Sequence, residues 1–289
     1  MSEQKLIFVT GKGGVGKSTV ALSIAKKYST NKKVLLVELG VRSFFADSLK
    51  ISVDYKPVRI QNNLDVALWS GSECLKEYAI YLLKIESLYN LFFENRISRA
   101  LIDVAPALSE LAILGKITSG VRNIGPSLNY DILVIDCYAT GHMLALLRAP
   151  RGIAEAIKFG PMAEQTSTML KTIKNSKICE FVIVTLPEEL PAIEADELFH
   201  EIFEEVGVTP ILICNKVWPR IPEKNINNKN ALTEAPEEKN FRQRVVEIIN
   251  RQQSWISYLI VRHPTMSQLP MIFSSDPNEI TNSMENLLL

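Results

Sequence analysis

The sequence has few cysteines, no excess of charge of either sign and no long apolar run. None of its four cysteines forms a Cys-x-x-Cys pair, so a zinc site built from such pairs is not visible within one chain. Thirty-two basic and 32 acidic side chains cancel, so no global field attracts nucleic acid or an anionic membrane. No apolar run approaches the length needed to span a bilayer, and the amino terminus lacks the apolar core of a signal peptide. We therefore expect a soluble, cytoplasmic protein with no integral membrane segment and no nucleic-acid partner.

The 289 residues, of which 47% are hydrophobic, suffice for one large α/β domain or for one domain with an inserted subdomain. Short apolar runs alternate with longer amphipathic stretches, which is typical of a parallel sheet covered by helices on both sides. The runs are nearly continuous in Val, Ile and Leu, as in strands that are buried on both faces. The predicted strands are Leu6–Thr10, Val34–Glu38, Ile132–Asp136, Phe181–Thr185 and Pro210–Asn215, with weaker candidates near Leu64–Leu68 and Gln268–Phe273. We predict a single doubly wound, mostly parallel domain over residues 1–289.

No strand is predicted in about residues 72–125. Cys74–Ile97 carries apolar residues at helical spacing over more than one face, and Leu101–Ile117 continues the helical character with a break at Pro106. We interpret this segment as a helical insertion that is seated on the sheet. The apolar side chains of residues 75–93 are then either the core of that subdomain or a surface for a client or partner.

The last third of the chain has one loop-like segment and two predicted helices. Residues 219–240 hold three prolines and five asparagines, which predicts a mobile loop. A helix follows over Phe241–Leu259. The final helix is predicted over Pro277–Leu288, with Asp276 as its N-cap and proline at its first position.

The stretch Gly11–Thr19 reads G-K-G-G-V-G-K-S-T and directly follows the first predicted strand. It satisfies the phosphate-binding pattern G-x-x-x-x-G-K-[ST], and a helix opens at its end. Glycines let backbone N–H groups turn toward one anion, because a positive φ angle costs glycine little, and the helix N-terminus also favours phosphate. The pattern predicts a P-loop that binds a nucleoside triphosphate. Its candidate binding residues are Gly11, Gly13, Gly14, Val15, Gly16, Lys17, Ser18 and Thr19.

Asp136 ends the predicted strand Ile132–Asp136, where a nucleotide site needs a carboxylate. It can hold Mg²⁺ through water while Ser18 supplies its hydroxyl, since Mg²⁺ prefers oxygen ligands and retains waters. Asp136 and Ser18 are therefore the candidate metal residues. In the plainer alternative, Asp136 caps the helix that follows.

After Asp136 the chain reads C-Y-A-T-G-H and continues into a leucine-rich helix. With the extra lysine of the P-loop, this segment resembles the ArsA/Get family of ATPases, in the deviant Walker A (SIMIBI) class, whose members carry D-T-A-P-T-G-H. Asp136, Thr140, Gly141 and His142 match that pattern, whereas Cys137, Tyr138 and Ala139 do not. The resemblance covers most of the chain. It implies an ATP-binding and ATP-hydrolysing switch protein with ATP and Mg²⁺ as cofactors.

The resemblance also implies roles for single residues. Lys12 matches the signature lysine, which in this class reaches the phosphates bound by the opposite subunit of a dimer. Val184–Glu188 resembles the family's V-x-x-P-E segment, and Asn215 matches an asparagine that hydrogen-bonds adenine. Plainer roles stay open, because Lys12 can be a solvated loop lysine, His142 a helix-end imidazole and Asn215 a turn residue.

The chain departs from the family after its second strand, where members carry D-P-A-H-S/N-L-S-D and the first aspartate positions or activates the attacking water. Gly40 stands at that position here, and Asp47 falls on the later aspartate. Losing a group of this kind typically removes ~10²–10⁴-fold in rate. Glu38, two residues earlier, resembles the first carboxylate of relatives with D-x-D, which contacts Mg²⁺-bound water. The candidate catalytic residues are Lys12, Lys17, Glu38 and Asp136.

Two functional hypotheses follow. In the first, the protein is an ATP-dependent switch that dimerises around nucleotide and hydrolyses it slowly, with Glu38 or a partner residue compensating for Gly40. In the second, it is a hydrolysis-deficient regulatory subunit of a heterodimeric ATPase. The choice between homodimer and heterodimer stays open, as does the choice between a protein client and a membrane-protein partner.

Other classes fit less of the sequence. The arsenite-pump branch of the family binds metalloid through cysteines, and this chain has no clustered trio; the tail-anchor-targeting branch uses in eukaryotes a C-x-x-C clasp that is absent here. ParA- and MinD-like positioning ATPases share Lys12 and the P-loop but lack T-G-H. An enzyme resembling the nitrogenase iron protein would need a second suitable cysteine besides Cys137.

Overall fold

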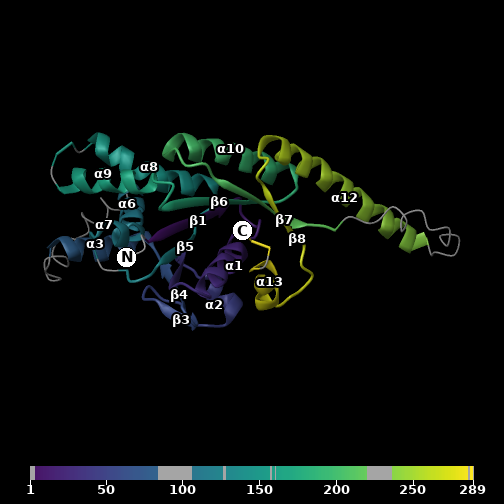
Figure 1. The fold of residues 1–289 in the computed structure, drawn as a ribbon, viewed down its shortest axis with the longest axis horizontal. Coiled ribbons are helices and arrows are strands. Elements are labelled where there is room, and N and C mark those ends of the chain that lie inside the picture. Colours follow the sequence, from purple (N-terminus) through teal and green to yellow (C-terminus); the bar gives the residue numbers. More distant parts are fainter. Residues whose placement is uncertain are drawn as a thin grey trace.

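An eight-stranded sheet forms the centre of the protein in the computed structural model, which describes residues 4–83, 106–125, 128–156, 158–159, 161–219, 236–285 and 287–288. The strands lie in the order β3-β4-β2-β5-β1-β6-β7-β8, and all neighbours are parallel except β3 and β4 (Figure 1). Their bounds are β1 (Lys5–Gly11), β2 (Val34–Leu39), β3 (Val58–Gln61), β4 (Leu64–Trp69), β5 (Ile132–Asp136), β6 (Cys179–Thr185), β7 (Ile211–Val217) and β8 (Ser267–Pro270).

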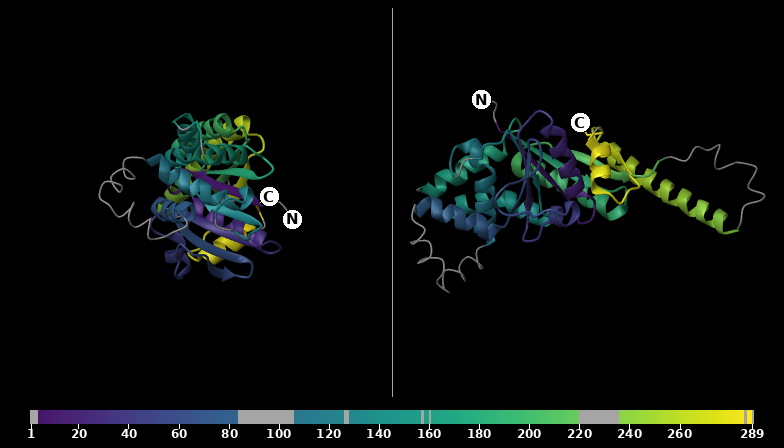
Figure 2. Two further views of the ribbon diagram at one scale, coloured as in Figure 1. Left: turned by 90° about the vertical axis from the view of Figure 1, so that its left-hand side faces the viewer. Right: turned by 90° about the horizontal axis from the view of Figure 1, so that it is seen from below.

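Helices cover both faces of this sheet, which confirms the predicted doubly wound, mostly parallel α/β class (Figures 1 and 2). Helices α1, α2 and α13 contribute to the core on one face, and α6, α8, α10 and α12 contribute to the core on the other. The amino-terminal half of α12 extends away from the sheet (Figures 1 and 2). The helix bounds are α1 (Lys17–Ser29), α2 (Phe44–Leu49), α3 (Gly71–Leu83), α6 (Pro106–Ile117), α7 (Ser119–Arg122), α8 (Thr140–Ala156), α9 (Pro161–Ile173), α10 (Glu189–Val206), α12 (Pro236–Arg262) and α13 (Pro277–Glu285).

The central strand β1 is buried on both faces, which explains the uninterrupted apolar run of residues 6–9. Leu6 and Phe8 point into the core under α8 and α10, whereas Ile7 and Val9 point into the core under α1. Phe8 stacks on Phe181 of β6, with 5.1 Å between the ring centroids. Successive side chains of residues 6–9 alternate between two buried faces, so each of these positions is apolar.

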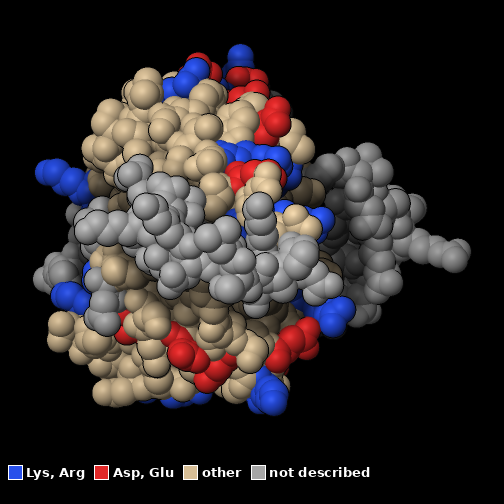
Figure 3. Space-filling view, turned by 90° about the vertical axis from the view of Figure 1, so that its right-hand side faces the viewer, with Lys and Arg blue, Asp and Glu red and all other residues tan. Residues whose placement is uncertain are grey.

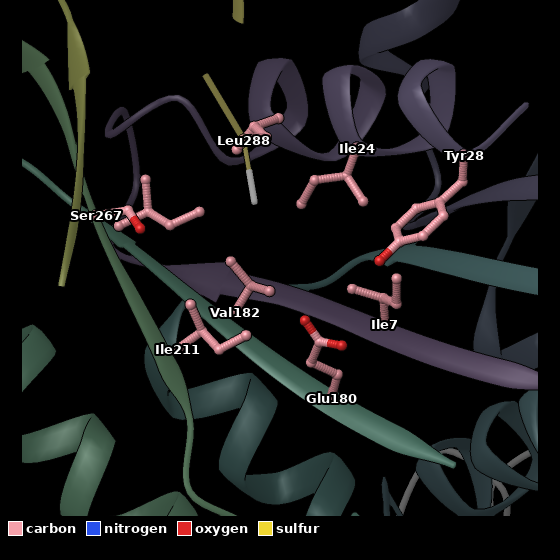
Figure 4. Close-up of a pocket in the computed structure, with 9 residues that line it drawn as sticks. Ile7, Ile24, Tyr28, Glu180, Val182, Ile211, Ser267 and Leu288 are labelled. Atoms are coloured by element: carbon pink, nitrogen blue, oxygen red, sulfur yellow. The ribbon is translucent and has the colours of Figure 1, made fainter. Parts of the chain in front are cut away.

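A cavity of about 40 Å³ lies on the α1 face of the sheet, between α1, β1, β6 and β7 (Figure 4). Ile24, Ile211 and Leu288 are among its apolar lining residues, and Glu180 and Tyr28 supply polar groups. None of the residues predicted for the nucleotide site lines this cavity. The cavity therefore lies away from the predicted chemistry.

All seven predicted strands are present, but two details differ. Strand β8 ends at Pro270 instead of reaching Phe273, whose side chain is 70% exposed. Strand β3 was not predicted; it is a four-residue antiparallel edge strand of alternating exposure. The alternation of Val58 and Ile60 with polar residues is the signal that could have found it.

In the described part of residues 72–125 the chain forms helices α3, α6 and α7, and the helical insertion seated on the sheet stays a prediction. Helix α6 packs against both α3 and α8, and its buried residues, among them Ile113 and Leu114, belong to the main core. Pro106 begins α6 and does not break a longer described helix, in keeping with the preference of proline for a first helical position. Residues 84–105, which include most of the apolar 75–93 stretch, lie outside the described residues, so the proposed choice between core and client surface stays a prediction.

Two helix boundaries in the last third were wrong. Helix α12 begins at Pro236 and ends at Arg262, so residues 236–240 of the predicted loop are helical; residues 220–235 lie outside the described part. Helix α13 ends at Glu285, because the N–H groups of Leu287 and Leu288 both turn back to the carbonyl of Met284. Its predicted N-cap is confirmed, since Asp276 Oδ1 accepts the Asn278 N–H at 2.9 Å. Among the described residues, no helix combines the length and apolar character needed to cross a membrane.

Candidate nucleotide-binding site

The P-loop lies at the carboxyl end of β1, between β5 and β6, and leads directly into α1. Gly11, Gly14 and Gly16 have positive φ angles of 139°, 83° and 96°, whereas Gly13 does not have a positive φ. A Cβ atom on Gly11 would lie 2.1 Å from the carbonyl oxygen of Val184, so β6 leaves no room for a side chain there. Gly13 and Gly14 are exposed at the surface, and Val15 is buried beneath them. The predicted strand–loop–helix arrangement is confirmed.

Both predicted lysines of the loop are folded back onto the protein. The Lys17 ammonium donates to the Lys12 carbonyl at 3.1 Å, and burial lowers its pKa while Asp136 opposes that change. The Lys12 ammonium forms an ion pair with Glu194 of α10. Sequence reasoning missed Glu194, because nothing in the chain's order indicates that α10 reaches the loop.

Asp136 is 5% exposed at the end of β5, and its Oδ1 is buried without a hydrogen-bond partner. Burial raises the pKa of this carboxyl to about 6, with a further upward contribution from Glu38 and opposing ones from the Ser18 hydroxyl and Lys17. An unsatisfied carboxylate oxygen beside a serine hydroxyl fits a hard cation such as Mg²⁺, which takes few protein ligands and keeps waters. No group of three or more His, Cys, Asp or Glu that could hold a metal occurs in the described part of the chain, so the rest of such a shell would be water and phosphate.

Glu38 lies beside Asp136, because the two residues are register partners on β2 and β5. Its carboxylate accepts from the Ser43 hydroxyl at 2.6 Å and from the Phe44 N–H, so each oxygen has a donor at the start of α2. Ser43 in turn caps α2 by accepting from the Ala46 N–H at 3.0 Å. Burial raises the pKa of Glu38, and these hydrogen bonds oppose the rise. The carboxylate therefore organises the segment that follows β2.

Gly40 has a φ angle of 156°, and the nearest atom to a Cβ placed there would be the Arg42 carbonyl oxygen at 3.8 Å. The position has space for a side chain but an unfavourable backbone conformation for one. Asp47, the later aspartate of the pattern, lies on the surface and pairs with Arg42 at 3.2 Å. Neither residue presents a carboxylate to the P-loop.

Asn215 of β7 is 1% exposed and lies under the P-loop, where its Nδ2 donates to the Val15 carbonyl at 2.9 Å. Lys216 follows it with a φ of 55°, and its Nζ lies 3.5 Å from the Gly14 carbonyl oxygen. Sequence reasoning assigned Asn215 to the base and missed Lys216. The adjacency of Lys216 to Asn215 is the only sequence signal that could have pointed to it.

The remaining predicted features surround this site. Thr140 begins α8, and the exposed His142 lies in its first turn beside the ring of Tyr138, with 5.6 Å between the centroids. Within the Val184–Glu188 segment, the hydroxyl of Thr185 donates to the Pro191 carbonyl at 2.7 Å. This hydrogen bond holds the start of α10. Cys137 and Cys214 are buried, as predicted, and burial raises the pKa of the Cys214 thiol to about 12.

The sequence model of a protein family described as "Anion-transporting ATPase" matches residues 4–174. Among curated relatives, a putative arsenical pump-driving ATPase of Halobacterium salinarum is 28% identical over 238 residues, which cover 76% of this chain and 36% of the relative. The ATPase BagA of Mycobacterium tuberculosis is 28% identical over 75% of this chain and 66% of its own length. An ATPase ASNA1 homolog of Entamoeba dispar is 24% identical over 74% of this chain and 77% of its own. The chain thus spans about a third of the halobacterial relative and just under two thirds of BagA.

Proposed function

The chain belongs to the ArsA family of anion-transporting ATPases, and we propose that it binds ATP with Mg²⁺ and hydrolyses it slowly. The observation that carries the proposal is the buried, unpartnered Oδ1 of Asp136 at the end of β5, beside a P-loop that contains Lys17 and Ser18. Three glycines with positive φ hold that loop open, which supports phosphate binding by its backbone. The names of the relatives support the ATPase class.

In this proposal each group has a separate task. The N–H groups of the P-loop and the start of α1 bind the phosphate oxygens, and Lys17 leaves the Lys12 carbonyl to neutralise their charge. Ser18 and Asp136 would hold Mg²⁺, the latter through water. When bound, the ion supplies charge neutralisation at the transferred phosphate. Lys12 is the residue we assign to a second nucleotide across a dimer.

Hydrolysis is proposed to be slow because neither candidate for positioning water is available. Gly40 has no side chain, and both oxygens of Glu38 accept hydrogen bonds within their own segment. The same observation favours a second candidate function, a regulatory subunit that binds ATP and is paired with a competent related ATPase. A rate of hydrolysis restored by such a partner would support that second function.

The partner is proposed to be another ATPase subunit together with a protein client or a membrane protein. The four cysteine thiols are buried. Burial raises the pKa of Cys74 and of Cys179 to about 12, which makes these thiols poor metalloid ligands. On the described part of the face in Figure 3, Lys and Arg side chains and Asp and Glu side chains are interspersed with other residues. These observations support a protein partner over a cysteine-bound metalloid or nucleic acid.

The test is ATP binding and turnover of the purified protein, alone and with Lys17→Ala. We expect Lys17→Ala to weaken Mg²⁺–ATP binding by about 100-fold, since a charge-assisted phosphate contact is lost. Lys12→Ala should leave binding within about threefold but abolish any change in solution mass on adding ATP. The matched control is Lys32→Ala, an exposed lysine in the turn after α1. Binding that is unaffected by Lys17→Ala would overturn the proposed site, and turnover at the usual rate of P-loop ATPases would overturn slow hydrolysis.

A further inference from the structure

We propose that Asn215 and Lys216 form a clamp on the outer side of the P-loop, in which both act as positioning residues for phosphate recognition. The inference rests on the proposed function, because it assigns these residues to the same phosphate site. It differs from the sequence-based expectation, in which Asn215 contacts the base. The clamp is defined as the side chains of Asn215 and Lys216 with the carbonyls of Gly14 and Val15.

Asn215 supplies the first contact of the clamp. Its Nδ2 donates to the Val15 carbonyl at 2.9 Å, although the two residues are 200 positions apart in the sequence. Its Oδ1 accepts the backbone N–H of Lys216 at 2.9 Å. A side chain that is 1% exposed and hydrogen-bonded at both ends has little freedom to turn toward a ligand.

Gly16 shows how closely Asn215 approaches the loop. A Cβ atom placed on Gly16 would lie 2.5 Å from Asn215 Nδ2, a distance that real Cβ atoms do not tolerate. Glycine at this position therefore serves two purposes: it adopts a φ of 96°, and it leaves the space that the amide of Asn215 fills. The clamp explains the second purpose, which the phosphate-binding pattern alone does not.

Lys216 supplies the second contact. Its φ of 55° is a left-handed conformation, which is uncommon for lysine and which the hydrogen bond from its N–H to Asn215 Oδ1 supports. In this conformation its Nζ lies 3.5 Å from the Gly14 carbonyl oxygen, and its Cε would lie 3.9 Å from a Cβ on Gly16. The side chain thus follows the outer side of the loop from Gly16 to Gly14.

Holding two consecutive carbonyls determines where the next N–H groups point. In a trans peptide the C=O of one residue and the N–H of the next point in opposite directions, and no described peptide bond is cis. With the Gly14 and Val15 carbonyls held outward, the N–H groups of Val15 and Gly16 face the inner side of the loop, where an anion binds. The clamp therefore prepares the loop for phosphate before any nucleotide arrives.

The first experiment separates a clamp from a base contact by comparing three ligands: Mg²⁺–ATP, Mg²⁺–GTP and Mg²⁺–tripolyphosphate. A clamp acts on phosphate alone, so Asn215→Ala should weaken all three by about tenfold, and Lys216→Met by about threefold. Lys216→Arg should stay within twofold of wild type because it keeps a cationic donor. A tenfold or larger loss for ATP, with unchanged tripolyphosphate binding, would overturn the clamp in favour of a base contact.

Lys50→Met is the matched control, because Lys50 is an exposed lysine with the same φ of 55°, at the end of α2 instead of the P-loop. It measures how ligand binding changes when a lysine with a left-handed backbone conformation is replaced at a site away from the P-loop. Binding by Lys50→Met should equal that of wild type for all three ligands. An equal loss in Lys50→Met and Lys216→Met would show that backbone strain, and no contact with Gly14, causes the effect.

The second experiment needs no ligand and keeps the clamp testable if the protein binds no nucleotide. Amide hydrogen exchange is measured in the nucleotide-free protein for wild type, Asn215→Ala and Lys216→Met. The N–H groups of Val15 and Gly16 are free, so the reporter is the amide of Val20 in α1, which donates to the Gly16 carbonyl at 3.0 Å. We expect exchange at Val20 to rise about tenfold in Asn215→Ala while the amides of β1 and β7 keep their protection. Unchanged exchange at Val20 would overturn the clamp, whereas absent ATP binding with raised exchange would overturn only the proposed function.

Discussion

The P-loop after β1 and the segment after β2 both begin at the carboxyl end of a parallel strand, yet their polar groups are used differently. In the P-loop, the carbonyls of Gly14 and Val15 accept from Lys216 and Asn215 of β7, which leaves N–H groups free on the inner side. In the β2 segment, residues 38–47, the carboxylate of Glu38 accepts two hydrogen bonds from its own segment. Phosphate binding and water positioning therefore depend on separate segments, and one function can change while the other is kept.

The two segments also use glycine differently. Gly11 cannot accept a Cβ because the Val184 carbonyl oxygen would be 2.1 Å away, whereas the nearest atom at Gly40 would be 3.8 Å away. Glycine is thus required at position 11 because β6 leaves no room for a side chain. At position 40 it is favoured only by the backbone φ angle. Substitutions at the two positions should separate these causes.

The largest expected effect is that of Gly11→Ala. Its Cβ would collide with backbone of β6, at a φ of 139° that alanine also disfavours. We expect a loss of about 4 kcal/mol in the free energy of unfolding, combining overpacking and backbone strain. Urea denaturation followed by circular dichroism measures it. A loss below 1 kcal/mol would show that β1 and β6 can separate here. It would contradict the proposed difference between Gly11 and Gly40.

The next effect concerns pH and Asp136. A pKa of about 6 in the folded protein, against an ordinary 3.8, means that the folded state binds the proton more tightly than the unfolded chain does. Asp136 therefore contributes stability below about pH 4 and loses it as the pH rises through 6, a change of about 3 kcal/mol. Relative to Asp136→Asn, the metal-free wild type should lose that amount between pH 4 and pH 8. A constant difference across this range contradicts the assignment.

Glu38→Ala tests the β2 segment directly. The substitution removes the acceptor of the Ser43 hydroxyl and the Phe44 N–H, and it also removes a like charge beside Asp136. We expect a net loss of about 2 kcal/mol in unfolding free energy, with ATP binding within threefold of wild type. Glu197→Ala, an exposed glutamate on α10, is the control. A tenfold loss of ATP binding in Glu38→Ala would show that the two segments are coupled.

The smallest effect is expected at Gly40. Both Gly40→Ala and Gly40→Asp should lower stability by about 1 kcal/mol, because the cost comes from the φ of 156° and no neighbour is displaced. We expect turnover of Gly40→Asp to stay within tenfold of wild type, because a φ of 156° is disfavoured for aspartate. A rise of 100-fold in Gly40→Asp, absent in Gly40→Ala, would show that a side chain alone was missing from the β2 segment.

Local patterns were sufficient for much of the fold. Runs such as Ile132–Ile135 are apolar at every position because both faces of the strand are buried, and that property is visible without the structure. Strand β3 was not predicted because four residues with one exposed face carry too weak a pattern. The start of α12 was not predicted because the whole proline-rich segment was interpreted as a loop. The ends of helices and strands depend on contacts with residues that are distant in the sequence, and a local pattern does not contain those residues.

A few consecutive residues suffice to identify the P-loop, the carboxylate of Asp136 at a strand end and the missing side chain at Gly40. The contacts of Asn215 and Lys216 with the loop, the ion pair of Glu194 with Lys12 and the hydrogen bonds from the start of α2 to Glu38 depend on the tertiary structure. The order of strands places β7 beside β6, which pairs with β1, and α10 packs against β1, so residues about 200 positions away reach the P-loop. A hydrogen bond needs both partners in place, and the fold alone brings them together.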